Sequence, residues 1–322
     1  MRIARDVALS DVLYYRIGGP VRALLEVHNA DDLQRAIEFV ERDRPARLLV
    51  VGLGSNLLMP DGYFDGAVIR ISAGADASIL RTDGSTQIEV FGGALLSDFA
   101  LLSLDRGLTG LEWAGGLPGT VGAGVRGNVG AFGGEIEQRF RSAEVIVFDE
   151  CHTRSLRLEH AKMDFAYRES WVKHQRNAIV ASVCFDLLPA SSHEINASKA
   201  IHQRNIDYRQ ARHPMEYPNC GSVFKNLAGE EQVGRVLNVW ADIESKVRTD
   251  WHGKVSMGYI IGRLGLAGKR VGGAEISTKH HNFIVNLGDA RASDVRALIS
   301  GIQETVFETF GLTPEVEIEI ID

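Results

Sequence analysis

The chain has 322 residues, of which 45% are hydrophobic and 24% are charged, and its formal net charge is -7. This length suits two or three packed units, and the composition is that of an ordinary folded protein. The acidic balance, without any block of Lys or Arg, argues against a nucleic-acid backbone or an anionic membrane surface as the main partner. A small anionic ligand is compatible with this charge.

Targeting and redox signals indicate a cytoplasmic protein. The first residues, MRIARDVALSDVLYY, contain no apolar core of signal-peptide length, and no apolar run approaches the roughly 18–20 residues that span a bilayer. The three cysteines, Cys151, Cys184 and Cys220, have no Cys-x-x-Cys spacing. Their odd number argues against a disulfide framework, and their spacing argues against a structural zinc site. We therefore predict no metal and a reducing environment.

The N-terminal elements predict an α/β unit followed by further strands. The stretch DDLQRAIEFV at 31–40 has its apolar residues on one helical face, namely Leu33, Ala36, Ile37 and Val40. The next stretch, RLLVV at 47–51, has four hydrophobic residues in a row after Arg47 and is expected to form a fully buried strand. Two more strands are expected from AVIRI at 67–71 and QIEVF at 87–91, because turn residues separate them.

A helix is expected after the strand at 87–91, with Ser97 as its cap and Gly107 at its end. The tract AGGLPGTVGAGVRGNVGAFGGE follows at 114–135, and nine of its 22 residues are glycine. Glycine allows positive φ and lets backbone N–H groups approach a ligand closely, as in loops that wrap phosphates. Tight turns and close packing explain any single glycine equally well. The density of glycines favours a ligand such as a pyrophosphate.

Neither glycine loop of the chain fits the Rossmann dinucleotide fingerprint. The GAGVRG match inside the tract follows LPGTV and not a strand. The earlier stretch VVGLGSNLLM follows a buried strand but has Leu57 where the third glycine would fall. Two such loops outside a Rossmann fold suggest one extended cofactor held from two sides.

The second half of the chain predicts more strands, a linker and a separate α+β domain. Strands are expected from AEVIVFD at 143–149 and AIVASVCFDL at 178–187. The stretch LLPASSHEINAS at 187–198 is rich in small polar residues and is typical of a linker. A helix at 293–310 has one apolar face, and the alternating EVEIEII at 315–321 predicts a strand.

Seven collinear motifs together resemble one known family. They are YYRIGGPV (14–21), VGLGSNLLM (51–59), GLPGTVGAGVRGNVGAFGGE (116–135), FAYRESWVK (165–173), PNCGSVFKN (218–226), GGAEISTKHHNFIVN (272–286) and GLTPEVEI (311–318). Their order and spacing are similar to those of UDP-N-acetylenolpyruvoylglucosamine reductase, the MurB family of peptidoglycan synthesis. The resemblance covers nearly the whole chain, and the STKHHNFIVN form resembles the shorter subtype of that family.

The resemblance implies an α+β fold with a two-part FAD-binding domain of vanillyl-alcohol-oxidase (PCMH) type and a C-terminal α+β substrate-binding domain. The expected boundaries are 1–70 and 71–190 for the two FAD-binding subdomains and 200–322 for the substrate domain. The resemblance also implies non-covalent FAD, NADPH as the reductant, and reduction of UDP-N-acetylglucosamine enolpyruvate to UDP-N-acetylmuramate. Neither nucleic acid nor a membrane is expected as a partner.

Cofactor contacts are implied for residues of the IGG, GLGSN and glycine-tract motifs. They are Gly18, Gly19, Gly52, Gly54, Ser55, Asn56, Leu57, Gly116, Gly119, Thr120, Val121, Gly122, Asn128 and Gly130. Reduction of the enolpyruvyl ether places negative charge on the α-carbon and carboxylate of the substrate, so cationic and hydrogen-bonding groups must be aimed at that charge.

Three catalytic residues are carried over from the motifs of the resembled family. Arg168 of FAYRES is expected to stabilise the enolate-like transition state, because a planar guanidinium suits a carboxylate. Ser222 of NCGSVFKN occupies the position of the proton donor, and Glu315 that of the carboxyl group assisting at the enolate. Implied substrate contacts are Tyr167, Lys225, Asn226 and His280.

The sequence departs from the family pattern at three places. Leu13 lies in the region where the family usually has a threonine before the IGG motif. Ala267 replaces the lysine of a GLKG motif, and Lys269 or Lys254 is a candidate to supply the missing charge. The segment 228–247 is additional and has a helical pattern. An alternative therefore stays open, a non-catalytic or altered-substrate flavoprotein on the same FAD-binding scaffold.

Overall fold

The chain folds into two compact units, each built from segments that are separate in the sequence. The computed structural model describes residues 1–73, 79–83, 86–149, 153–175 and 177–322. The first unit consists of Met1–Val7, Val21–Leu53 and Phe64–Ala211. The second unit consists of Ala8–Pro20, Gly54–Tyr63 and Arg212–Asp322. The three-part division expected from the sequence, 1–70, 71–190 and 200–322, stays a prediction.

The first sheet of the first unit has the strand order β1–β3–β6–β4. Its strands are β1 (Arg2–Ala4), β3 (Pro20–Val27), β6 (Phe64–Ile71) and β4 (Leu48–Val51). β1 is antiparallel to β3, whereas β3 and β4 both run parallel to β6. Within β4 only Val51 is buried, so the prediction of a fully buried strand is wrong, and the position of β4 at the edge of the sheet explains its exposure.

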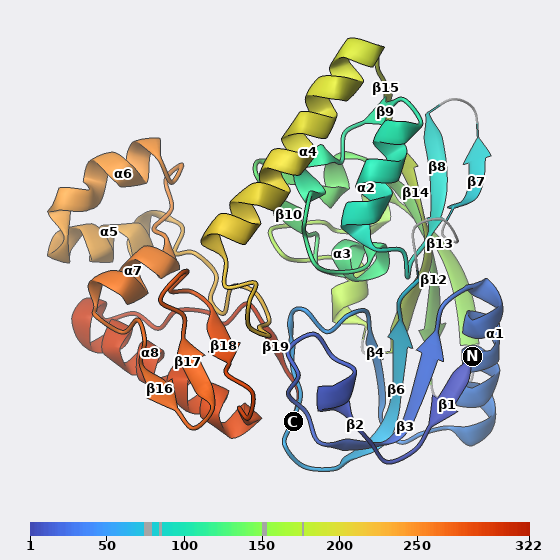
Figure 1. Cartoon of the computed structure of the whole chain (residues 1–322), viewed down its shortest axis with the longest axis horizontal. Helices are drawn as coiled ribbons and strands as arrows, with labels where there is room; N and C mark the ends of the chain where they lie inside the picture. Colours follow the sequence, from blue (N-terminus) through green and yellow to red (C-terminus); the bar gives the residue numbers. More distant parts are fainter. Residues whose placement is uncertain (74–78, 84–85, 150–152, 176) are drawn as a thin grey trace. The chain divides into compact units, whose positions relative to one another are not determined.

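Helix α1 (Ala30–Asp43) packs its apolar face against this sheet, as the sequence predicted (Figure 1). The helix begins at Asn29, whose Oδ1 accepts a hydrogen bond from the N–H of Asp32 at 2.9 Å. Its four predicted face residues are buried, namely Leu33, Ala36, Ile37 and Val40. Such a cap and such a face are what a helix needs to form at the surface of a sheet.

The second sheet of the first unit is antiparallel and has the order β13–β12–β14–β8–β7. Its strands are β13 (Thr153–Glu159), β12 (Phe140–Phe148), β14 (Ala178–Asp186), β8 (Gln87–Phe91) and β7 (Ile79–Asp83). Helices α2 (Leu96–Asp105) and α3 (Val121–Arg126) bury residues against β8 and β14. The strands predicted at 87–91, 143–149 and 178–187 are therefore confirmed.

Both sheets of the first unit contribute to one buried cluster. Phe91, Ile146, Phe148 and Ile179 of the second sheet join residues of α1, β3 and β6 there. The unit also contains short strand pairs and single turns of 3₁₀ helix. These are β9 (Leu108–Thr109) with β15 (Leu188–Pro189), β10 (Gly130–Ala131) with β11 (Gly134–Glu135), η2 (Glu112–Ala114), η3 (Ile136–Gln138), η4 (His160–Lys162) and η5 (Trp171–His174).

Helix α4 (Ser192–Arg212) occupies most of the segment that the sequence suggested as a linker. The linker prediction is therefore wrong over its second half. Three buried polar residues of α4 bond to the first unit: His202 Nε2 lies 3.1 Å from Ser97 O, and Asn205 Nδ2 donates to Glu112 O at 3.1 Å. Arg209 Nε donates to Gly115 O at 3.1 Å. The sequence pattern did not predict this helix, because its buried face is polar and not apolar.

Helix α2 begins differently from the prediction. Its N-cap is Leu95, without a side-chain hydrogen bond, and the Ser97 hydroxyl instead accepts a hydrogen bond from the N–H of Gly116 at 2.8 Å. Gly107 follows the end of the helix with a φ of 76°, so the predicted stop is confirmed. Ser97 therefore fixes the glycine tract and does not cap α2.

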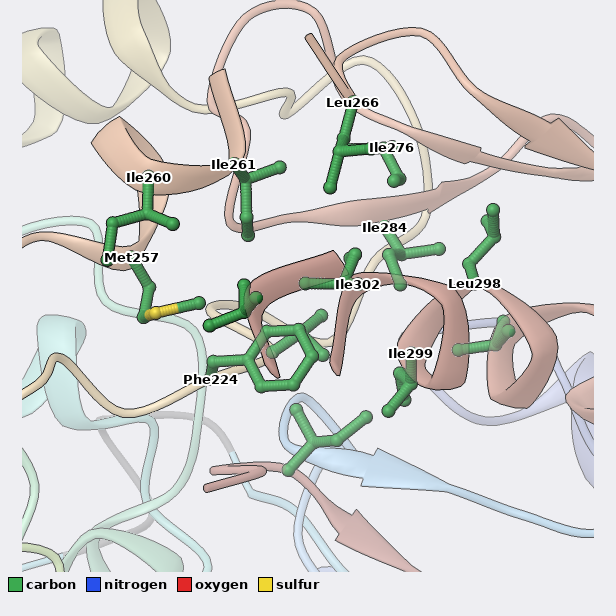
Figure 2. Packing of buried hydrophobic residues seen from close by; sticks show 14 of the residues in the cluster. Phe224, Met257, Ile260, Ile261, Leu266, Ile276, Ile284, Leu298, Ile299 and Ile302 are labelled. Atoms are coloured by element: carbon green, nitrogen blue, oxygen red, sulfur yellow. The ribbon is translucent and has the colours of Figure 1, made fainter. Parts of the chain in front are cut away.

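The second unit has a small antiparallel sheet, and its C-terminal segment Arg212–Asp322 contains four α-helices and one 3₁₀ helix. The sheet order is β16 (Arg270–Val271), β17 (Ala274–Ile276) and β18 (Ile284–Asn286). The helices are η6 (Ala241–Ile243), α5 (Glu230–Val239), α6 (Glu244–Thr249), α7 (Met257–Arg263) and α8 (Ala292–Phe310). Figure 2 shows isoleucines of α7, β17, β18 and α8 gathered with Phe224 and Met257 in one buried cluster. Helix α8 confirms the prediction at 293–310, and α5 and α6 confirm the helical pattern at 228–247.

Two N-terminal segments are built into the second unit. Tyr15 is fully buried, and its hydroxyl donates to Ile284 O at 2.9 Å. Strand β5 (Leu57–Leu58) pairs in parallel with β19 (Glu319–Ile320) near the C-terminus. Both carboxylate oxygens of Asp61 accept backbone N–H groups at the start of α8, from Ala292 at 2.6 Å and Ser293 at 3.0 Å. Of the remaining short elements, η1 (Leu9–Asp11) belongs to this unit, and β2 (Val7–Ala8) pairs with β3 as the fifth strand of the first sheet.

The strand predicted at 315–321 is shorter than expected. Only Glu319–Ile320 is a regular strand, whereas Val316 makes an isolated bridge with Phe224. Among the cysteines, Cys184 and Cys220 are free and buried, and Cys151 lies outside the described residues. No helix in the described ranges has the length and apolar character needed to cross a membrane.

Candidate active site

The glycine tract forms an irregular loop that leads into α3. Gly119 has a φ of 146°, a conformation that an L side chain rarely adopts, and Thr120 caps α3 by accepting the N–H of Ala123 at 3.4 Å. A Cβ atom on Gly52 would lie 2.6 Å from Thr120 Oγ1. The absence of a side chain at Gly52 therefore allows the first glycine loop to touch the tract, and the two predicted loops meet here within the first unit.

The tract also holds donors suited to an anion. The backbone N–H groups of Gly119 and Thr120 donate to no residue in the part of the chain that the structure describes. Thr120 is buried, and buried N–H groups without a partner are rare unless a ligand satisfies them. An irregular loop with such donors fits the phosphate groups of FAD, the cofactor that the motifs imply.

Close packing accounts for other glycines of the tract. A Cβ atom on Gly122 would lie 3.0 Å from the carbonyl oxygen of Gly92, and one on Gly134 would collide with the Trp113 ring. Sequence reasoning assigned the density of glycines to a ligand. A side chain at either position would meet neighbouring protein atoms, a requirement that the glycine pattern alone does not reveal, and the predicted cofactor contact at Gly122 stays a prediction.

Asn128 links the tract to a second motif of the first unit. It is fully buried, with a left-handed φ of 38°. Its Nδ2 donates to Ala166 O at 3.0 Å and to Glu135 Oε2 at 3.4 Å, and its Oδ1 accepts the N–H of Glu137 at 3.3 Å. The whole amide is thus engaged by the protein, so the role that the geometry supports for Asn128 is to hold two loops together.

Arg168 lies on the loop that Asn128 anchors. Its φ is 60°, and its Nη2 donates to Gly130 O at 3.2 Å. The guanidinium carbon is 5.1 Å from the centroid of the Tyr167 ring, which is 40% exposed. The predicted catalytic arginine, the predicted substrate contact Tyr167 and the glycine tract are therefore brought together in the first unit.

Two residues that the sequence did not single out fix the Arg168 loop. Lys173 Nζ donates to Arg168 O at 2.6 Å and to Glu169 Oε1 at 2.7 Å. The fully buried Ser170 donates its hydroxyl proton to Arg126 O at 2.7 Å. A left-handed non-glycine residue is held in place only when its surroundings bind it firmly. The sequence alone does not show that Arg168 has a positive φ, so it does not predict that Lys173 and Ser170 are needed to hold the loop.

In the second unit, the Gly54–Asn56 part of the GLGSN motif packs beside the Ser222 turn. The N–H of Glu319 donates to Asn56 O at 3.0 Å, and Leu57 pairs with Glu319 across the β5–β19 ladder. A Cβ atom on Gly221 would lie 3.7 Å from Ser55 O. The half-buried Ser222 hydroxyl bonds to no residue in the described ranges, which leaves it available to a ligand.

Lys225 and Glu315 are paired in the same unit. Their backbones join through the Lys225 N–H and Glu315 O at 3.0 Å, and Lys225 Nζ lies 2.6 Å from Glu315 Oε1. The Glu315 side chain is 69% exposed, whereas that of Lys225 is 16% exposed. The second unit therefore brings together Ser222, Lys225 and Glu315, three residues that the motifs selected.

The other predicted substrate contacts of this unit differ in their surroundings. Asn226 Oδ1 accepts the N–H of Met257 at 3.1 Å and so fixes the start of α7. His280 packs against His213 and Phe283, and burial lowers the pKa of its imidazole. Its Nδ1 is buried without a hydrogen-bond partner among the described residues. A neutral imidazole with an unused nitrogen is suited to a polar ligand group.

The IGG motif is also packed by protein atoms. Gly18 has a φ of 143°, and a Cβ atom there would lie 2.9 Å from the Cβ atoms of both Leu9 and Met59. A Cβ atom on Gly19 would collide with the Gly62 carbonyl oxygen. Leu13 is buried, and its Cδ2 would lie 2.9 Å from a Cβ atom on Gly54. The leucine that departs from the family pattern thus fills the space beside the GLGSN loop.

Comparison with known proteins identifies the class of molecule to which this fold and these motifs belong. Residues 21–150 match the family model described as FAD binding domain, and residues 213–321 match that described as UDP-N-acetylenolpyruvoylglucosamine reductase, C-terminal domain. An FAD-binding domain followed by this second domain defines a flavin-dependent oxidoreductase.

Full-length relatives narrow the class to one family. The chain is 37% identical to UDP-N-acetylenolpyruvoylglucosamine reductase 2 of Symbiobacterium thermophilum, over 99% of this chain and 92% of the relative. It is 34% identical to the reductase of Anoxybacillus flavithermus, over 95% and 90%. A crystal structure of the reductase (MurB) from Thermus caldophilus matches with a TM-score of 0.72 at 30% identity, covering both chains completely. The chain belongs to the UDP-N-acetylenolpyruvoylglucosamine reductase (MurB) family, and the resemblance and the α+β fold are confirmed.

Proposed function

We propose that this chain reduces UDP-N-acetylglucosamine enolpyruvate to UDP-N-acetylmuramate in peptidoglycan precursor synthesis, with non-covalent FAD and with NADPH as the reductant. The observation that carries this proposal is identity of 34–37% to named reductases over 95–99% of the chain. The cytoplasmic location expected from the sequence stays a prediction.

The proposed chemistry divides between the cofactor and the chain. FAD, when bound, supplies the hydride that the β-carbon of the enolpyruvyl group receives. The charge then develops on the α-carbon and carboxylate of the substrate. Arg168 is the residue we assign to that carboxylate, because its guanidinium stays charged and can bind two oxygens at once. Its backbone is held by Lys173 at 2.6 Å, so the group is positioned before substrate arrives.

The α-carbon must next receive a proton, and we assign this step to the Ser222 hydroxyl. A serine is a weak acid and donates only when it is placed beside a strongly basic carbon, so geometry has to supply what its pKa does not. Glu315, paired with Lys225 at 2.6 Å, is the carboxylate we assign to the same end of the substrate. Tyr167, Lys225, Asn226 and His280 are the proposed substrate contacts.

Purified protein provides the first test. We expect a yellow protein whose FAD enters the supernatant on acid precipitation, and NADPH oxidation that depends on UDP-N-acetylglucosamine enolpyruvate. Flavin that stays with the pellet would contradict non-covalent binding. Bound flavin without turnover on this substrate would favour the alternative of a non-catalytic or altered-substrate flavoprotein, for which Leu13 packed at Gly54 and Ala267 are the motivating observations.

The role of Ser222 is tested by separating the two half-reactions. In Ser222→Ala, stopped-flow absorbance should show near-normal bleaching of the flavin by NADPH and slow reoxidation by the sugar nucleotide. Ser300→Ala is the matched control, because Ser300 lies on the exposed face of α8. Equal loss in both half-reactions would instead make Ser222 a structural residue.

A further inference from the structure

Arg209 is a buried cation beside the glycine tract. It lies on α4, is 9% exposed, and makes one hydrogen bond, from Nε to Gly115 O at 3.1 Å. Its Nη2 is buried without a partner, and no carboxylate in the described part of the chain forms an ion pair with it. Charged residues are almost never buried in this way without a counter-charge. Arg209 therefore has the properties of a group whose partner is a ligand.

The surroundings of Arg209 define the kind of ligand. A Cβ atom on Gly116 would lie 3.2 Å from Arg209 Cδ, so the guanidinium stem runs directly along the tract. The Phe132 ring centroid is 5.1 Å from the guanidinium carbon, and Phe132 meets Tyr208 edge to face at 5.4 Å. These two rings are 47% and 49% exposed. Exposed aromatic faces next to a cation suit a nucleotide, whose base stacks while its phosphates take the charge.

The other polar residues on the same face of α4 show why the position is unusual. His202 and Asn205 are buried as well, and each reaches a backbone oxygen, His202 that of Ser97 and Asn205 that of Glu112. These bonds already fix the helix. Burial lowers the pKa of Arg209 to about 10, because a buried guanidinium loses its hydration, and the group stays charged at neutral pH. Anchoring of helix α4 therefore does not explain why a charged side chain is buried at Arg209.

We propose that Arg209 binds a phosphate oxygen of a nucleotide diphosphate held at the glycine tract. The inference rests on the proposed function, which provides two sources of this chemistry, the diphosphate of FAD and that of the uridine sugar nucleotide. Arg209 lies between the two matched family regions, 21–150 and 213–321, so neither region includes it. A guanidinium is suited to phosphate because its N–H groups match two oxygens at once.

The test compares Arg209→Met, which keeps the length of the side chain and removes its charge, with Arg204→Met. Arg204 lies on the same helix and is exposed, so its substitution is the matched control. FAD and riboflavin are titrated into flavin-free full-length protein, and UDP and uridine into the FAD-bound protein, by calorimetry. UDP differs from uridine only in its diphosphate, whereas FAD differs from riboflavin in its diphosphate and its adenosine. Adenosine is therefore titrated into the flavin-free protein as well, and riboflavin, adenosine and uridine together report the contacts that do not involve a diphosphate.

We expect Arg209→Met to weaken one of the two diphosphate ligands by about tenfold or more, the loss of one charge-assisted hydrogen bond. Weaker FAD with unchanged riboflavin and UDP identifies the cofactor as the source, and weaker UDP with unchanged uridine and FAD identifies the sugar nucleotide. Unchanged FAD and UDP affinity refutes the proposal. Equal weakening of riboflavin and FAD, or of uridine and UDP, also refutes it, because the effect would then be one of packing.

Two features keep the result interpretable. If Arg209→Met does not fold, Arg209→Lys provides the same comparison, since it retains charge but loses the planar fork, and a smaller loss confined to the diphosphate ligands is then expected. None of the titrations requires turnover. If the wild-type protein reduces the sugar nucleotide and Arg209→Met binds FAD and UDP normally, only the role of Arg209 is refuted. If Arg209→Met shows a phosphate-specific loss of affinity and the wild-type protein shows no turnover, only the reductase function is refuted.

Discussion

Replacing Asn128 tests whether this residue holds the protein together or binds flavin. Its amide makes three hydrogen bonds in a fully buried position, and its φ of 38° is left-handed. Asn128→Ala leaves the Ala166 carbonyl and the Glu137 N–H without their partner, at a cost of roughly 1 kcal/mol each at the low end of the usual range. Alanine in a left-handed conformation adds about 1 kcal/mol, so the total is about 3 kcal/mol.

Asn128→Gly separates these two contributions, because glycine adopts positive φ without strain. It should cost only about 2 kcal/mol. For domains of this size, 1 kcal/mol lowers the melting temperature by roughly 2–4 °C, so we expect a loss of about 6–12 °C for Asn128→Ala and about 4–8 °C for Asn128→Gly. The measurement is thermal unfolding of flavin-free protein by circular dichroism. If both variants unfold at the wild-type temperature while their FAD affinity falls, the structural role assigned to Asn128 is refuted.

Three further predictions concern other parts of the two units. Lys173→Met should slow flavin reoxidation by the sugar nucleotide about tenfold in stopped-flow, with normal reduction by NADPH, because it removes the 2.6 Å bond that holds the Arg168 backbone; equal slowing of both steps would contradict this. Asp61→Ala should lower the free energy of unfolding by about 1–2 kcal/mol in a urea titration, since two N–H groups at the start of α8 lose their acceptor, and Asp61→Asn should lower it less. Because the pKa of His280 is lowered in the folded protein, the unfolded chain binds the imidazole proton first as the pH drops, and stability should fall below about pH 6.5. His280→Gln should therefore show a shallower fall in melting temperature between neutral and mildly acidic buffer, and a pH dependence identical to that of the wild type would show that His280 is not responsible.

The regular elements of the fold were predictable where burial repeats with a fixed period. Helix α1 and helix α8 have apolar residues at helical spacing, and β12 and β14 each contain a mostly hydrophobic run with three β-branched residues, so local pattern and tertiary packing agree. Helix α4 failed this reading because it presents His202, Asn205 and Arg209 to its neighbours. A helix with a polar buried face resembles a linker until its partners are known.

The candidate site was predictable only in part, and for a different reason. Motif resemblance selected Arg168, Ser222 and Glu315, and their roles stay proposals. The residues that hold these groups were not found, because Lys173 and Ser170 act through backbone oxygens of Arg168 and Arg126. Their importance depends on a positive φ and on a long-range contact, and neither leaves a periodic or compositional trace in a single sequence.

The interleaving of the two units also determines how this chain can be synthesised and divided. Tyr15, Ile17 and Leu58 belong to the core of the second unit, whose other members lie beyond residue 219. While the chain leaves the ribosome, these three side chains have no core to enter until the last third has been made, and they stay open to chaperones and to aggregation. A chain cut after Ala211 would leave them exposed permanently. Neither half can therefore be obtained as a well-behaved fragment by truncation at one point.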